Sequence, residues 1–164
     1  MSTQIRAVVI TVSDACANGH RADTSGQALV ELLNELGADI AEKRILSDDL
    51  DPLTAALREI CGRGDVNLIV TTGGTGLGPR DNTPEATLKV IEREAPGIAE
   101  AIRAESLKVT PMAMISRGVC GVCGGTLIVN LPGSPKAVRE SFAVIKPVLS
   151  HAVDLLAGKT QHRD

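Results

Sequence analysis

Residues 66–78 have the sequence Val-Asn-Leu-Ile-Val-Thr-Thr-Gly-Gly-Thr-Gly-Leu-Gly. The first seven are largely apolar and β-branched and predict a buried strand, and the glycines predict a tight turn directly after it. Glycine permits positive φ and lets backbone N–H groups approach an anion closely, so the loop is a candidate phosphate cradle. It is not a Walker loop, because Pro79 and Arg80 follow where that loop has lysine. A plain strand-to-helix turn is the alternative interpretation.

Apolar runs alternate with segments of helical period on both sides of this loop. Residues 6–12 and 39–46 predict two further strands, and residues 98–107 predict a helix. This alternation is typical of parallel strands joined by crossover helices. It predicts an α/β fold: a three-layer sandwich with a mostly parallel, Rossmann-like central sheet flanked by helices.

Local signals predict where individual elements begin. Thr24 and Gln27 resemble a capping box, and Thr83 followed by proline predicts another helix start. Residues 112–131 have a strand-like pattern with glycine interruptions, which predicts a hairpin plus a central strand with Met112 and Met114 in the core. Ser134 and Pro135 open a last long helix, and the few residues after Gly158 are expected to fray.

The composition excludes several classes of protein. The 164 residues predict one domain, 1–164, with a formal charge of −3, one Phe and no Tyr or Trp. Neither clustered cations nor aromatic stacking platforms are available, which argues against general nucleic-acid binding. The apolar runs are too short to span a membrane, and residues 1–6 lack the apolar core of a signal peptide. Four cysteines without such a signal predict reduced thiols and a cytoplasmic protein.

Polar residues follow the ends of four predicted strands. Ligands of open parallel sheets bind beyond the carboxyl ends of the strands, so these loops are expected to converge on one cleft. The loops are Ser13-Asp14, Ser47-Asp48-Asp49, residues 73–81 and residues 130–134. Asp48 and Asp81 beside a phosphate cradle are the pair of carboxylates that magnesium requires. The alternative is that each aspartate is a helix cap or a solvated turn residue, and the role of Asp14 is open.

Cys120 and Cys123 have the spacing of half a zinc site. Tetrahedral zinc needs four ligands, and the chain has no second such pair, so packed thiols are the favoured interpretation.

With these motifs together, the chain resembles the molybdopterin adenylyltransferase family, which includes bacterial Mog-type proteins, the G domain of gephyrin and its plant counterpart. The resemblance covers nearly all of the chain, from Thr11 to about Leu156. It is carried by Asp23-Thr-Ser-Gly26, Thr71-Thr-Gly-Gly-Thr-Gly76, Pro79-Arg-Asp-Asn-Thr-Pro-Glu-Ala-Thr87, Ile91-Glu-Arg-Glu-Ala-Pro-Gly97, Val109-Thr-Pro111, Ser116-Arg117 and Asn130-Leu-Pro-Gly-Ser134. It implies adenylylation of molybdopterin by ATP with release of pyrophosphate, a magnesium ion, a homotrimer, and a molybdate-inserting enzyme as a downstream partner.

The resemblance also implies roles for individual residues. Asp48 and Asp81 would hold magnesium, and Asp81 could instead align the triphosphate. The other implied substrate-binding residues are Gly73, Gly74, Thr75 and Gly76 at phosphate, Ser106, Ser116, Asn130, Pro132, Gly133 and Ser134 around molybdopterin, and Ser13 and Asp14 at the nucleotide end. Ser47 and Asn82 depart from the usual proline and valine without removing a functional group.

Two other functions remain open at this stage. One is a catalytically silent molybdopterin-binding or scaffolding paralogue, against which the presence of both Asp48 and Asp81 speaks. The other is an unrelated nucleotide-binding enzyme with the same glycine loop. The segment 130–134 argues against it, because a plain nucleotide site needs no second phosphate cradle.

Overall fold

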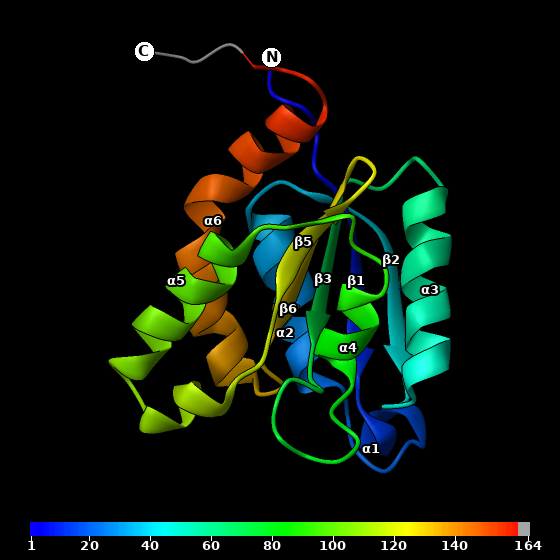
Figure 1. The fold of residues 1–164 in the computed structure, drawn as a ribbon, viewed down its shortest axis with the longest axis vertical. Helices are drawn as coiled ribbons and strands as arrows, with labels where there is room; N and C mark the ends of the chain where they lie inside the picture. Colours follow the sequence, from blue (N-terminus) through cyan, green and yellow to red (C-terminus); the bar gives the residue numbers. More distant parts are fainter. Residues whose placement is uncertain (161–164) are drawn as a thin grey trace.

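Four neighbouring parallel strands make up most of a six-stranded sheet in the computed structural model, which describes residues 1–160 (Figure 1). The sheet has the order β2-β1-β3-β6-β5-β4. The parallel strands are β1 (Arg6–Val12), β2 (Asp39–Leu46), β3 (Leu68–Thr72) and β6 (Thr126–Leu131), and the antiparallel pairs add β5 (Cys120–Cys123) and β4 (Arg93–Glu94). The predicted α/β sandwich with a mostly parallel sheet is confirmed.

Helices cover both faces of this sheet, because its central strands are apolar on both sides. In β1, Ala7 and Val9 pack toward one face, whereas Val8 and Ile10 pack toward the other. The first face is covered by α2 (Thr24–Glu35), α5 (Pro96–Leu107) and α6 (Pro135–Leu156), and the second by α3 (Leu50–Gly62) and α4 (Thr83–Leu88) (Figure 1). The two apolar cores hold the strands rigidly and fix the loops at their carboxyl ends.

Two helices begin one residue away from the predicted cap. The N-cap of α2 is Asp23 rather than Thr24, because the Asp23 carboxylate accepts the Gly26 amide at 2.9 Å. The predicted return bond from Gln27 is absent, since its amide donates instead to Glu31 on the exposed face. At α4 the N-cap position belongs to Asn82, and the Thr83 hydroxyl donates to the Gly73 carbonyl at 2.8 Å.

The start of the predicted hairpin region is helical instead of extended. Residues 111–115 form a 3-10 helix, η1, whose first turn is capped by the Thr110 hydroxyl. Met112 and Met114 are therefore exposed, and the prediction that they belong to the core is wrong. The hairpin itself is confirmed as β5 and β6, joined at Gly124 and Gly125.

Cys120 of β5 lies in the core, and burial raises the pKa of its thiol to about 12. Cys123 packs against the core on the other face of the sheet. Within residues 1–160, no helix is long and apolar enough to cross a membrane. Of the tail expected to fray after Gly158, residues 161–164 lie outside the described part of the chain.

Candidate active site

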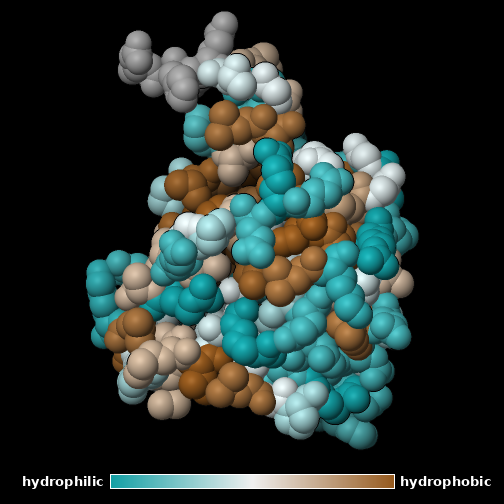
Figure 2. Space-filling view, viewed as in Figure 1, coloured by the Kyte–Doolittle hydropathy of each residue, from teal (hydrophilic) through white to brown (hydrophobic). Residues whose placement is uncertain are grey.

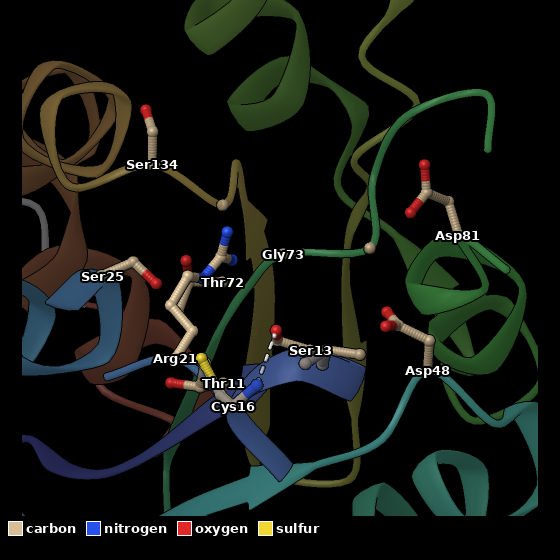
Figure 3. Close-up of a pocket in the computed structure, with 13 residues that line it drawn as sticks. Thr11, Ser13, Cys16, Arg21, Ser25, Asp48, Thr72, Gly73, Asp81 and Ser134 are labelled. Atoms are coloured by element: carbon tan, nitrogen blue, oxygen red, sulfur yellow. Dashed lines mark hydrogen bonds between the residues drawn. The ribbon is translucent and has the colours of Figure 1, made fainter. Parts of the chain in front are cut away.

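A pocket of about 380 Å³ lies at the carboxyl edge of the parallel strands (Figure 3). The four loops predicted to converge all reach it. Of the predicted site residues, its lining includes Ser13, Asp48, Gly73, Gly74, Asp81, Gly133 and Ser134. Asp48 and Asp81 therefore face one hollow together with the glycine loop, as the strand-end argument predicts.

Asp48 is held at the pocket by a reciprocal pair of bonds with Asp14. The Asp14 amide donates to the Asp48 carboxylate at 2.8 Å, and the Asp48 amide donates to the Asp14 carboxylate at 3.0 Å. Arg80 binds the Asp14 carboxylate through two nitrogens, at 2.6 and 3.0 Å, and binds Asp49 at 3.0 Å. The loops after β1, β2 and β3 are thereby joined through the Asp14 side chain.

The two linked carboxyl groups have pKa values shifted in opposite directions. Partial burial raises the pKa of Asp48 above its usual value, and the negative charges of Asp14 and Asp81 raise it further. The hydrogen bonds from Arg80 lower the pKa of Asp14 to about 2. Asp14 is thus neutralised by a protein cation, whereas within residues 1–160 Asp48 forms no ion pair, so its charge favours an incoming cation.

Asp81 is fixed at the other side of the pocket by the glycine loop that precedes it. Its carboxylate accepts the Gly78 amide at 2.9 Å, and a Cβ added at Gly76 or Gly78 would lie within 3.0 Å of the same carboxylate. Arg117 also holds this loop. Its guanidinium donates to the carbonyls of Gly76 and Asp81, each at 2.7 Å, and forms an ion pair with Glu85.

The glycine loop has a backbone shape that other residues adopt only with strain. Gly73 has φ +97°, and a Cβ there would lie 2.3 Å from the Val12 carbonyl oxygen. The Gly73 amide donates to the Leu131 carbonyl at 3.1 Å, so it is not free to bind a ligand. Within residues 1–160, the amides of Gly74, Thr75 and Gly76 donate no hydrogen bond to the protein. Three successive free amides are suited to bind an anion.

Several predicted site residues lie outside the pocket. Ser106 borders a separate cavity between α5 and α6, and Ser116 follows η1. The Asn130 side chain is buried and bonds to Thr71, Thr87 and the Val119 amide, so its amide holds β6 in place. The lining also leaves out Asp14, Thr75, Gly76 and Pro132, of which Pro132 accepts a bond from the Thr72 hydroxyl at 2.8 Å.

Six lining residues were not predicted. Thr11, Val12 and Thr72 stand at the ends of β1 and β3, so the strand-end rule could have included them. The others come from α1 (Asp14–Ala17), from α2 and from the loop between these helices: Cys16, Arg21 and Ser25. Ser25 belongs to the Asp23-Thr-Ser-Gly26 motif of the family resemblance, which could have indicated it. Sequence reasoning gave no signal for Arg21, because the path of residues 18–23 depends on contacts made after folding.

The fold and the pocket define an α/β protein with a polar pocket at the carboxyl edge of a parallel sheet. The chain matches the family described as "probable molybdopterin binding domain" over residues 8–151. It belongs to that family.

Known relatives agree with this assignment. A molybdopterin adenylyltransferase from Helicobacter pylori is 40% identical over 152 residues, covering 92% of this chain and 86% of its own length. The molybdenum cofactor synthesis protein cinnamon from Drosophila melanogaster is 46% identical over 149 residues, but the match spans only 25% of that protein and 90% of this chain. The crystal structure of the molybdopterin biosynthesis enzyme MoaB from Thermus thermophilus superposes with a TM-score of 0.89 at 47% identity, covering 95% of this chain and 98% of its own.

Proposed function

We propose that this chain is a molybdopterin adenylyltransferase. In this reaction the terminal phosphate of molybdopterin attacks the α-phosphorus of ATP. The bond between the α-phosphorus and the bridging oxygen breaks, and pyrophosphate leaves. The observation that carries the proposal is that Asp48, Asp81 and Gly74, whose amide is free, line one pocket. Relatives named molybdopterin adenylyltransferase support it.

The reaction asks the protein for positioning and charge neutralisation. A phosphate nucleophile is already ionised, so no strong base is needed, but two polyanions must meet in line. The free amide of Gly74, a residue that lines the pocket, would donate to a phosphoryl oxygen without rearranging. Arg117 holds the backbone of the glycine loop by donating to the carbonyls of Gly76 and Asp81.

We propose magnesium as the cofactor, held by Asp48 and Asp81. The donors fit, because magnesium prefers carboxylate oxygens and uses only one or two from the protein, the rest coming from water and phosphate. The raised pKa of Asp48 also fits, since burial and neighbouring negative charges disfavour its ionised form and a cation would relieve both effects. When bound, the ion would supply charge neutralisation of the phosphates.

The two aspartates distinguish an active enzyme from a silent binding protein. A protein that only bound molybdopterin would not require two carboxylates facing the phosphate cradle, because their charge repels the ligand's phosphate when no cation is present. We therefore favour catalysis over a scaffolding role.

We further propose a homotrimer in the cytoplasm that passes its product to a molybdate-inserting enzyme. Apolar side chains exposed around the end of α5 and η1 support self-association, and Figure 2 shows this apolar surface at the lower left. These side chains are Leu107, Val109, Met112, Met114 and Ile115. The four free cysteines are compatible with a reducing compartment.

The test is pyrophosphate release on incubation with molybdopterin, ATP and magnesium. The wild type should turn over, and Asp48→Ala should lower the rate by about 10²–10³-fold because it removes charge stabilisation in the transition state. Asp48→Ala should still fold, as circular dichroism would check. The matched control is Asp51→Ala, which removes an exposed carboxylate in the first turn of α3 outside the pocket and should retain the wild-type rate. Wild-type turnover in Asp48→Ala would contradict the proposal that Asp48 holds magnesium. Absence of pyrophosphate release by the wild type would contradict the proposal that this chain is an adenylyltransferase.

A further inference from the structure

The pocket contains one charged group that the proposed reaction does not yet use, the guanidinium of Arg21. Arg21 lies in the loop between α1 and α2. Figure 3 shows its side chain turned into the pocket on the side of Ser25 and Ser134, with Asp48 and Asp81 on the opposite side. The pocket therefore has an acidic end and a cationic end.

The loop that carries Arg21 is anchored on both sides. The amides of His20 and Arg21 both donate to the Ala15 carbonyl, at 2.9 and 3.2 Å. Two residues beyond Arg21, the Asp23 carboxylate accepts the Thr11 hydroxyl and the Gly26 amide, each at 2.9 Å. The backbone of Arg21 is thus tied to the end of α1 and to the start of α2, which keeps its side chain beside the pocket.

No carboxylate of the described chain neutralises Arg21. Residues 1–160 show no ion pair to it, in contrast to Arg80, which binds both Asp14 and Asp49. The acid closest in sequence, Asp23, is nearly buried and pairs with Lys43 at 3.0 Å. The Arg21 guanidinium therefore keeps its hydrogen-bond donors for an anion that enters from solvent.

We propose that Arg21 binds a phosphoryl group of the substrate directly, in an anion subsite that needs no metal. Its neighbours in this part of the pocket are the hydroxyls of Ser25 and Ser134, which add neutral donors to the guanidinium. A guanidinium binds phosphate through two parallel hydrogen bonds, which a hydroxyl cluster alone does not provide. The assignment of this phosphoryl group to molybdopterin or to ATP rests on the proposed function.

The direct test is calorimetric titration of the protein with inorganic pyrophosphate in EDTA, where the Asp48 and Asp81 end has no cation to offer. The wild type should bind, and Arg21→Gln should weaken binding by about tenfold or more, because a charge-assisted bond is lost. Arg21→Lys should fall between the two, since it keeps the charge without the fork geometry. Arg93→Gln is the matched control: it makes the same change of charge at an exposed strand residue outside the pocket and should bind as the wild type does.

Measurement of KM for each substrate in Arg21→Gln identifies which substrate places a phosphoryl group in the subsite. A raised KM for molybdopterin in Arg21→Gln would assign the subsite to the molybdopterin phosphate, and a raised KM for ATP would assign it to the triphosphate. Equal pyrophosphate affinity of the wild type and Arg21→Gln, no binding by the wild type in EDTA, or two unchanged KM values would each overturn the proposal. A wild type that binds pyrophosphate through Arg21 without adenylylating molybdopterin would instead refute the proposed function and leave the anion subsite standing.

Discussion

Asp14 is a small side chain that joins three loops of the site. Its carboxylate accepts bonds from the Asp48 amide and the Arg80 guanidinium, and its own amide binds the Asp48 carboxylate. Asp14 does not line the pocket, whereas Asp48 does. Asp14 can therefore affect the site only through its contacts with Asp48 and Arg80. We infer that it positions Asp48, a different role from the nucleotide contact implied by the family resemblance.

This link gives a pH dependence with a defined sign. The pKa of Asp14 is about 2 in the folded chain, below its ordinary value of 3.8, because Arg80 stabilises the ionised form. The stability that it contributes is therefore present above pH 3.8 and lost as pH falls from 3.8 to about 2. We expect Asp14→Asn to reduce the dependence of the unfolding free energy on pH in that window, as measured by urea denaturation.

Asp51→Asn is the control for this measurement, because it removes an exposed carboxylate outside the Asp14–Arg80 pairing. It should lose the same stability as the wild type between pH 3.8 and 2. Identical pH profiles for the wild type and Asp14→Asn would show that the pairing contributes nothing to folding.

At the scale of elements, the turn after β3 depends on glycine at one position in particular. Gly73→Ala would force alanine to φ +97° and bring its Cβ to 2.3 Å from the Val12 carbonyl oxygen. Gly37→Ala imposes a comparable positive φ of +85° with nothing within 4 Å of the added Cβ. We expect Gly37→Ala to cost about 1–2 kcal/mol and Gly73→Ala about 1–3 kcal/mol more, as measured by urea denaturation. Equal losses of unfolding free energy in the two variants would contradict this prediction, because they would mean that the close contact with the Val12 carbonyl costs nothing.

The order and type of the central elements could be predicted because their signals are local. In β1, Val8 and Val9 face opposite sides of the sheet, and both are buried, so an unbroken apolar run sufficed to indicate a strand covered on two faces. The N-cap of α2 could not be predicted, because Asp23 and Thr24 are both good caps. Asp23 is favoured through its contacts with Thr11 and Lys43, which only the folded sheet brings near.

The residues of the candidate site likewise include some that the sequence could predict and some that it could not. Asp48 lies just after β2, and topology brings the ends of parallel strands to one edge of the sheet. Asp81 lies at the end of the loop after β3, where the Gly78 amide holds its carboxylate. Arg21 follows a short helix, so its place at the pocket depends on how its loop folds back. Ser106 lies on α5, which packs against α6, and it borders a different cavity. The family resemblance alone could not show this placement, because it depends on how the two helices pack.

At the scale of the whole molecule, the surface suggests that one chain does not act alone. Met112 and Met114 are more than 60% exposed, in contrast to the tightly buried residues of both cores. Large apolar side chains grouped on a surface are typical of an interface. The same turn that removes these methionines from the core therefore makes them available to a second copy.

We expect the protein to sediment at three times the 17.1 kDa mass of one chain. The double change Met112→Asp with Met114→Asp should shift it toward the monomer, because charges at a buried contact are costly to desolvate. Leu88→Asp, at an exposed apolar residue on α4, is the control and should leave the assembly intact. A monomeric wild type would contradict the trimer.

Arg117 has a consequence for how freely the glycine loop can vary. Its guanidinium binds the carbonyl oxygens of Gly76 and Asp81, which every amino acid possesses, and the intervening Leu77 side chain is 66% exposed. The grip on the loop is therefore indifferent to the identity of the side chain at position 77. That position is a natural place to attach a reporter dye or to build a mutant library, because new chemistry can be introduced beside the pocket while the backbone stays clamped.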